Sequence, residues 1–169
     1  MHNFKEIKPT ELKENAIKLI GNDWMLISAG DDIKYNAMTA SWGGMGMLWN
    51  KPVMFIFIRP HRFTYQFVEQ EEYFTCSFYD EKYRDKLNFF GTYSGRDYDK
   101  AKETGFTVVK INNSIAFNEA RIVIVCRKVY QEDIQPEHFL ASFILKHYPS
   151  MDYHRMYIGE IMSVWINEE

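Results

Sequence analysis

Apolar residues along this chain gather mostly in short runs, and few of them recur at helical spacing. Two runs, residues 24–29 and 33–38, flank the turn Gly30-Asp31-Asp32, and this arrangement predicts a β-hairpin. Further strands are predicted at residues 53–59, 73–79, 106–110, 115–117, 120–130 and 153–166. Gly159 interrupts the last of these runs and predicts a β-bulge there.

Helical spacing is found in fewer segments. In residues 10–20, Leu12, Ala16 and Leu19 share a face, and Gly21 is placed to end the helix. Other helices are predicted at residues 62–70, 82–90, 97–103 and 136–145, with Asp97 as a cap and Pro136 in a first turn. Residues 91–95 predict a turn-rich loop between two of them.

This mixture of elements predicts a mainly β fold. Strands outnumber helices and do not alternate with them regularly, which disfavours a doubly wound parallel sheet and favours a β-barrel with helices packed outside. Residues 53–58 are apolar on both strand faces, so the face outside the barrel needs a helix or a second subunit as cover. The chain has no repeat or linker, which predicts one domain over residues 1–169.

Composition and charge exclude several classes of protein. The net charge of −3, without a basic stripe, argues against nucleic-acid binding. The longest apolar run is too short to span a bilayer and the N-terminus lacks a signal-peptide core, so we expect a cytoplasmic protein without a membrane partner. Cys76 and Cys126 lie far apart without zinc-ligand spacing, which predicts buried free thiols and no metal site.

Residues 36–49 carry the first candidate chemistry. The small residues and hydroxyls of Asn36-Ala37-Met38-Thr39-Ala40-Ser41-Trp42 would let backbone groups approach a flat heterocycle, on which Trp42 and Met45 could pack. Residues 39–49 hold three glycines and predict a loop or a bulged edge, but they do not complete a Rossmann glycine pattern. The alternative is a bulged strand edge with Trp42 in the core, which composition alone favours.

Three further segments carry groups that suit an anionic or polar ligand. In Arg59-Pro60-His61-Arg62-Phe63-Thr64, arginines and a threonine fall where a strand gives way to a helix, as in many phosphate sites. In Ser94-Gly95-Arg96-Asp97-Tyr98-Asp99-Lys100, Arg96 and Lys100 share a helical face. His154 enters the last strand and could touch a ligand or move a proton. Each segment is also compatible with a purely structural role.

In their order and content, four segments resemble the flavin reductase-like, flavoredoxin-type family of FMN-binding split barrels. They are NAMTASWGGMGMLWNKPV, IRPHRFTYQFVEQEEYFTCSF, SGRDYDK and HRMYIGEI. The resemblance covers residues 15–160. It departs from the family's commoner Asp-His pattern by the insertion of Tyr153 before His154.

The resemblance implies a homodimeric split β-barrel that holds FMN without a covalent bond at or near the subunit interface. It assigns contacts with the flavin ring to Asn36, Met38, Thr39, Ala40, Ser41, Trp42 and Met45. It assigns the phosphate end and the rest of the pocket to Arg62, Phe63, Thr64, Gly95, Arg96, Lys100 and His154.

The resemblance also implies an oxidoreductase that passes hydride or electrons from NAD(P)H through FMN to a flavin or small acceptor. The sequence holds no nicotinamide motif, so a flavoredoxin-like carrier between redox partner proteins is a second reading. A split-barrel binding module for haem or a pyridoxal-type phosphate is a third. No catalytic residue is assigned, although His154 is the candidate.

Overall fold

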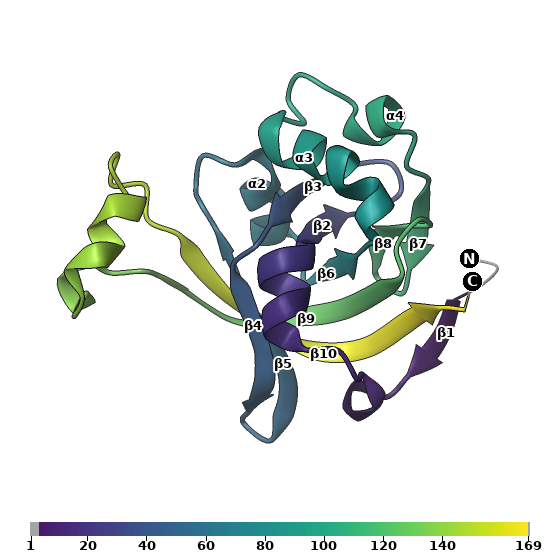
Figure 1. Ribbon diagram of the computed structural model, residues 1–169, viewed down its shortest axis with the longest axis horizontal. Helices are drawn as coiled ribbons and strands as arrows, with labels where there is room; N and C mark the ends of the chain where they lie inside the picture. Colours follow the sequence, from purple (N-terminus) through teal and green to yellow (C-terminus); the bar gives the residue numbers. More distant parts are fainter. Residues whose placement is uncertain (1–3, 169) are drawn as a thin grey trace.

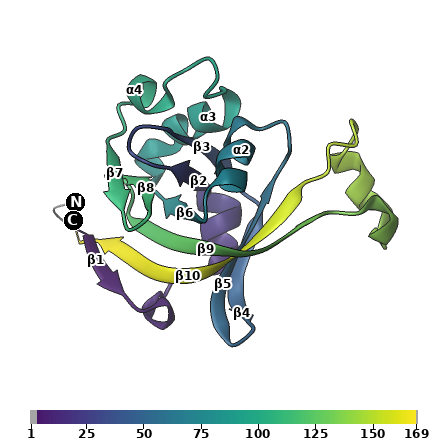
Figure 2. The same cartoon turned by 180° about the vertical axis from the view of Figure 1, so that it is seen from behind.

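The computed structural model describes residues 4–168, and an antiparallel β-sheet forms its main body (Figures 1 and 2). The strand order is β3-β2-β6-β9-β10-β5-β4, and β1 pairs with the far end of β10. The strands are β1 Phe4–Ile7, β2 Met25–Gly30, β3 Tyr35–Ala40, β4 Gly43–Leu48, β5 Lys51–Ile58, β6 Tyr73–Phe78, β9 Ile122–Asp133 and β10 Arg155–Asn167. The strands predicted by the apolar runs are therefore confirmed, with shifts of a few residues at their ends.

Two apolar clusters lie on opposite faces of the sheet. Ile124 belongs to the cluster inside the barrel, whereas its neighbours Val123 and Val125 belong to the cluster outside it. This alternation follows from the two-residue period of side chains along a strand. The outer cluster is covered by α3 Arg84–Thr92, α4 Lys100–Thr104 and the small hairpin of β7 Val108–Ile111 and β8 Ser114–Phe117. The barrel with external helices is thus confirmed.

Helix α2 covers the inner cluster instead. It spans Phe63–Gln70, and its buried residues Phe67 and Val68 pack into the barrel interior. Shorter 3-10 or π turns lie at Pro9–Glu11, Leu19–Asp23, Glu81–Tyr83, Pro136–His138 and Ser142–His147. Cys76 and Cys126 are buried free thiols, as the sequence predicts.

The helix predicted at residues 10–20 is wrong in its first half. Regular helix begins only at α1 Ala16–Lys18, which continues into a π turn. The Asn15 side chain accepts a hydrogen bond from the backbone N–H of Lys18 at 3.0 Å, so Asn15 is the N-cap and the chain before it is not helical. Asn15 therefore starts the helix and is not one of its interior residues.

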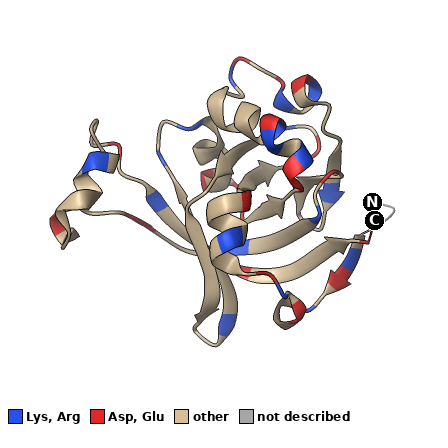
Figure 3. Cartoon of the chain, viewed as in Figure 1, with Lys and Arg blue, Asp and Glu red and all other residues tan. Residues whose placement is uncertain are grey.

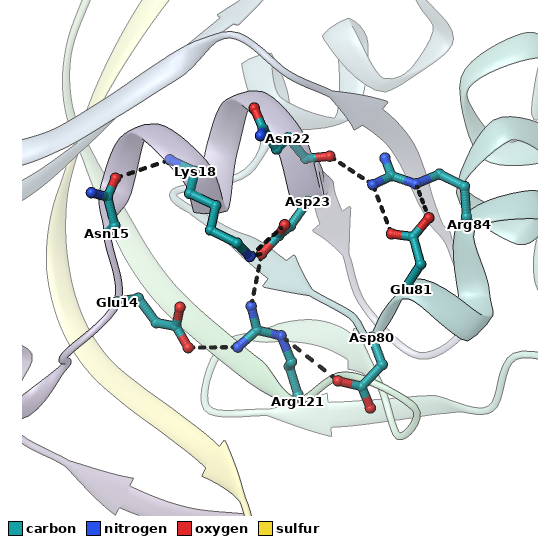
Figure 4. Close-up of polar contacts among 9 residues, drawn as sticks. All are labelled: Glu14, Asn15, Lys18, Asn22, Asp23, Asp80, Glu81, Arg84 and Arg121. Atoms are coloured by element: carbon teal, nitrogen blue, oxygen red, sulfur yellow. Dashed lines mark hydrogen bonds and ion pairs between the residues drawn. The ribbon is translucent and has the colours of Figure 1, made fainter.

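Arg121 ties this N-terminal segment to the barrel (Figure 4). It lies directly before β9, and its guanidinium pairs with Glu14 at 2.6 Å and Asp23 at 3.1 Å. Asp23 also pairs with Lys18 at 2.8 Å. The half-buried guanidinium thus holds both ends of the α1 segment against the sheet.

The sequence predicts a loop or a bulged edge at residues 39–49. The edge position is confirmed, whereas the loop is wrong, because most of the segment forms the regular strand β4. The strand lies at the edge of the sheet and pairs with β5 from Gly43 to Leu48. A Cβ at Gly43 would lie 2.7 Å from the Phe55 carbonyl oxygen, so glycine is required there by close backbone approach. Trp49 and Asn50 both have positive φ and form the two-residue turn to β5.

Two helix predictions need correction. Helix α4 begins after Asp99, whose side chain accepts from Lys102 N–H at 3.2 Å, and the predicted cap Asp97 lies in the preceding turn. Residues 136–145 form two separate 3-10 turns rather than one helix. Leu140, Phe143 and Leu145 are exposed there, and short helices need the packing of an apolar face to persist.

Residues 134–154, between β9 and β10, form an arm that extends away from the barrel (Figures 1 and 2). Leu140 is fully exposed on it and Phe143 is 63% exposed. Figure 3 shows few charged residues along the arm. In β10, a register shift between Ile158 and Gly159 lies where the sequence predicts a bulge, although the residue skipped in the pairing is Val129 of β9.

Candidate functional site

A cavity of about 200 Å³ lies where β3, the start of α2 and the start of α4 meet. Its lining includes eight of the residues singled out in the sequence: Asn36, Met38, Arg62, Phe63, Thr64, Gly95, Arg96 and Lys100. Segments that lie far apart in the chain are thus brought to one place. No carboxylate is among the described residues that line it.

Buried polar contacts join β3 to α2 at this cavity. The Asn36 side-chain amide donates to the Thr64 hydroxyl oxygen at 2.8 Å, and both residues are buried. A Cβ at Gly95 would lie 2.1 Å from the Asn36 side-chain oxygen and 3.1 Å from the Phe63 ring. Only glycine therefore lets the loop before α4 approach these residues.

Three cations surround the cavity with spare hydrogen-bonding capacity. Within residues 4–168, the half-buried Arg62 guanidinium has no hydrogen-bond or ion-pair partner. Arg96 donates to the His61 carbonyl at 3.3 Å and lies 4.7 Å from the Phe63 ring centroid. The Lys100 ammonium donates to the Phe90 carbonyl at 3.0 Å, which leaves two of its three donors free.

Lys100 is the most perturbed of these groups. It is only 5% exposed. Burial, and secondarily the positive charge of Arg62, lowers the pKa of Lys100 to about 7. Burial also lowers the pKa of Arg62, with the Arg59 charge as a second cause. An anion in the cavity would relieve this mutual repulsion, so the site is electrostatically suited to bind one.

The other residues predicted to contact a ring do not line this cavity. Thr39 donates its hydroxyl proton to the Leu87 carbonyl and so fastens β3 to α3. Ala40 and Met45 pack against the barrel interior, from β3 and β4 respectively. Ser41 lies between these strands, next to Trp42.

His154 and Trp42 meet at the base of the arm. Their ring centroids lie 5.1 Å apart, and the Trp42 ring is also 5.3 Å from that of His147. His154 Nδ1 shares a hydrogen bond of 2.8 Å with the Tyr148 hydroxyl. Burial, with a further contribution from the Arg59 charge, lowers the pKa of His154 to about 4, so the ring is neutral at pH 7.

Sequence reasoning did not single out several lining residues, namely Gly91, Thr92 and Tyr93. Gly91 and Thr92 end α3 and Tyr93 is its C-cap, so the turn-rich loop predicted at residues 91–95 starts two residues later than expected. Tyr148 was missed as well, because the helix predicted across residues 136–145 gave no reason to bring the end of the arm back to His154.

A larger groove of about 1310 Å³ lies between the N-terminal segment and the ends of β9 and β10. Its lining mixes carboxylates such as Glu14 and Asp80 with cations such as Arg121, and these groups pair with one another. None of the predicted site residues lines it. The smaller cavity is lined by cationic side chains and, among the described residues, by no carboxylate, so it is the better candidate for ligand binding.

Neither a metal-binding cluster nor a membrane-spanning helix is found within residues 4–168. No group of three His, Cys, Asp or Glu side chains is arranged to hold a metal ion. None of the helices there has the length and apolarity that crossing a bilayer requires.

Comparison with known proteins gives a clear family match. The model of the "Flavin reductase like domain" family matches residues 18–169. No significant match was found among curated proteins.

Several solved structures share the fold. The FMN-binding domain of a flavin reductases-like enzyme from Shewanella baltica OS155 matches with a TM-score of 0.71 at 16% identity, over 98% of this chain and 78% of that one. Flavoredoxin of Desulfovibrio vulgaris (Miyazaki F) matches with a TM-score of 0.67 at 24% identity, over 86% and 69%. An FMN-binding protein from Thermus thermophilus with bound p-hydroxybenzaldehyde matches with a TM-score of 0.66 at 19% identity, over 86% and 71%. At these identities the likeness shows a shared split-barrel fold.

Proposed function

Because the chain belongs to the flavin reductase-like domain family, we propose that it is an FMN-dependent oxidoreductase that passes hydride or electrons from NAD(P)H to a flavin or another small acceptor. The observation that carries the proposal is the convergence of Arg62, Arg96 and Lys100 on one carboxylate-free cavity beside β3. The family match supports flavin chemistry, and the cavity supports a ligand with an anionic end.

The residues present fit the phosphate of FMN. Arg62, Arg96 and Lys100 can give it charge-assisted hydrogen bonds, which are the strong kind in a half-buried site. The first turn of α2 adds backbone N–H groups next to Thr64. The Thr64 oxygen already accepts from Asn36, so its hydroxyl proton is free to be donated to the phosphate.

FMN, when bound, supplies the hydride- and electron-transfer chemistry. The chain's part is to bind and orient it. Strand β3 is the last strand on its side of the sheet and pairs only with β2, so alternate backbone groups of residues 36–40 have no strand partner and can face a ring. N–H groups among them would stabilise negative charge on that ring. Trp42 and the neutral His154 would exclude water from its edge.

The site supports a homodimer as the working form. A volume of about 200 Å³ is below the ~300–1,000 Å³ of usual ligand pockets, so it suits the phosphate end while the ring extends past it. The exposed apolar residues of the arm, led by Leu140 and Phe143, suit burial by a second copy of the chain. We therefore propose that a second subunit covers the ring.

Absorbance spectroscopy of the purified protein tests the cofactor. We expect a yellow protein with a flavin spectrum, or an apoprotein that acquires one with FMN, whereas a Soret band would favour the haem alternative. Lys100→Met should weaken FMN binding by about tenfold or more, because a buried charged hydrogen bond is lost. Lys102→Met is the matched control, since Lys102 is exposed on the same helix and should bind FMN as the wild type does.

Anaerobic mixing of the FMN-loaded protein with NADH or NADPH tests the reaction. Rapid bleaching of the flavin absorbance supports the reductase. Flavin that resists both nucleotides but is reduced by a redox protein supports the carrier, which the fold shared with a flavoredoxin keeps as the second candidate. In the binding test, equal dissociation constants for FMN in Lys100→Met, Lys102→Met and the wild type would contradict the assignment of this cavity as the FMN site.

A further inference from the structure

Arg59 holds the returning end of the arm through three separate contacts. It directly follows β5, at the edge of the segment that lines the cavity. One guanidinium nitrogen lies 2.6 Å from a carboxylate oxygen of Asp152, and another donates to the His147 carbonyl at 2.7 Å. The guanidinium carbon Cζ lies over the Tyr148 ring, 5.1 Å from its centroid.

These contacts bear on the aromatic cluster. Tyr148, which Arg59 covers, is buried and shares its hydroxyl with His154 Nδ1. His147, whose carbonyl Arg59 holds, packs its ring on Trp42. One guanidinium therefore touches the backbone or ring of both arm residues that contact His154 and Trp42.

We propose that Arg59 is a positioning residue, which locks the arm's return segment, residues 147–152, against the barrel and thereby assembles Tyr148, His154 and Trp42 into one cluster. The planar fork of arginine makes two directed hydrogen bonds and a ring contact at once. A lysine at position 59 would keep the charge and lose that geometry. The proposal rests on the proposed function in one respect only, namely that this cluster lies next to the bound flavin.

Two measurements on the apoprotein test the proposal without FMN. The first is the rate of tryptic cleavage after Lys146, which lies in the arm. We expect Arg59→Met and Arg59→Lys each to speed that cleavage by about tenfold or more, because charged hydrogen bonds that fasten the arm are lost.

The second is the pKa of His154, followed by NMR. The groups that face His154 are Tyr148, Arg59, Asp152 and His61. We expect the pKa to rise from about 4 toward the ordinary value near 6.5 in both variants, because a loosened arm admits water to the ring. In Arg59→Met the loss of the Arg59 charge adds to the rise, whereas Arg59→Lys keeps the charge and isolates the effect of the arm.

Arg84→Met is the matched control. The Arg84 side chain is 23% exposed, as is that of Arg59, and it too donates to a backbone carbonyl, pairs with a carboxylate and lies on an aromatic ring. It lies by α1, so its loss should leave both readings at wild-type values. Wild-type readings in Arg59→Lys would show that only charge matters and overturn the proposal. Equal changes in Arg84→Met would show general destabilisation and overturn it as well.

Discussion

At the scale of single residues, Lys100 combines burial with spare donors. Its ammonium is enclosed by Phe90 and faces Arg62 across the cavity, and the pKa of about 7 reflects that enclosure. A group with such a pKa is half charged near neutral pH. Its charge is therefore available to a phosphate dianion but is not fixed in the free protein.

FMN affinity should depend on pH through this residue. Below pH 7 Lys100 carries its proton in the free protein, whereas above pH 7 it has lost that proton and binding must take one up. The dissociation constant should therefore rise between pH 7 and 9, by up to about tenfold per pH unit. Fluorescence titration of FMN at each pH measures it.

Two variants isolate the contribution of Lys100 to this pH dependence. Lys100→Met should flatten the rise above pH 7, and Lys102→Met should keep it. A rise of the same steepness in Lys100→Met would assign the effect to another group.

The sequence predicted much of this site by residue type. Arginines at a strand-to-helix junction and a lysine four residues after Arg96 indicated phosphate binding, and the structure brings Arg62, Arg96 and Lys100 to one cavity. The helical face predicted for Arg96 and Lys100 is wrong, however, because Arg96 lies in the turn before α4. The pKa of Lys100 could not be predicted, because it depends on burial by Phe90 from another helix. The type of a residue can be read from the sequence, whereas the desolvation that shifts its pKa depends on tertiary packing.

At the scale of elements, α4 shows how a cap decides where a side chain points. The helix starts after Asp99, so Lys100 is its first residue and faces the cavity. Had Asp97 been the cap, as the sequence suggested, Lys100 would lie most of a turn into the helix. By residue type, Asp97 and Asp99 are equally good caps. The structure selects Asp99, because the backbone N–H of Asp97 already donates to the Ser94 carbonyl in the preceding turn.

A pair of alanine variants distinguishes the two caps. Asp99→Ala should lower the free energy of unfolding by about 1 kcal/mol, because the Lys102 N–H loses its acceptor. Asp97→Ala should change it by less than half as much, since Asp97 lies outside the helix. Denaturant unfolding of both variants measures the difference, and a larger loss in Asp97→Ala would contradict the observed helix start.

Strands were predicted more reliably than helices in this chain. Residues 122–126 of the apolar run at 120–130 are buried on both faces of the barrel wall, so local pattern and tertiary environment agree there. Residues 136–145 have apolar spacing without a surface to pack on, and there the pattern misled. The regular pairing of the edge strand β4 was not predicted either, because its three glycines hide the alternation of a strand, and the one at Gly43 is required by the close Phe55 backbone.

At the scale of the whole molecule, the arm is attached to the barrel at its base, whereas Leu140 and Phe143 are left exposed. We propose that a second subunit that binds these exposed residues would reach the cofactor site through the base of the arm, where Arg59 attaches it next to the segment that lines the cavity. Dimerisation and FMN binding should therefore be coupled.

Charges on the arm should break that coupling. The double variant Leu140→Glu and Phe143→Glu should shift the protein from dimer to monomer and raise the FMN dissociation constant by about tenfold or more. Light scattering and FMN titration measure the two effects. Ile33→Glu is the control, because Ile33 is 90% exposed on the β2–β3 turn and should alter neither. A monomeric arm variant that binds FMN with wild-type affinity would contradict the proposal that a second subunit contributes to the site.

The position of β10 in the sheet has a consequence for synthesis on the ribosome. Although it is the last strand of the described chain, it lies between β9 and β5 and pairs with both. Until residues 155–161 have left the exit tunnel, the nascent chain therefore presents two unpaired strand edges, and contacts so distant in sequence form slowly. Chaperone binding during translation should be greatest in that interval, before β10 pairs with β9 and β5.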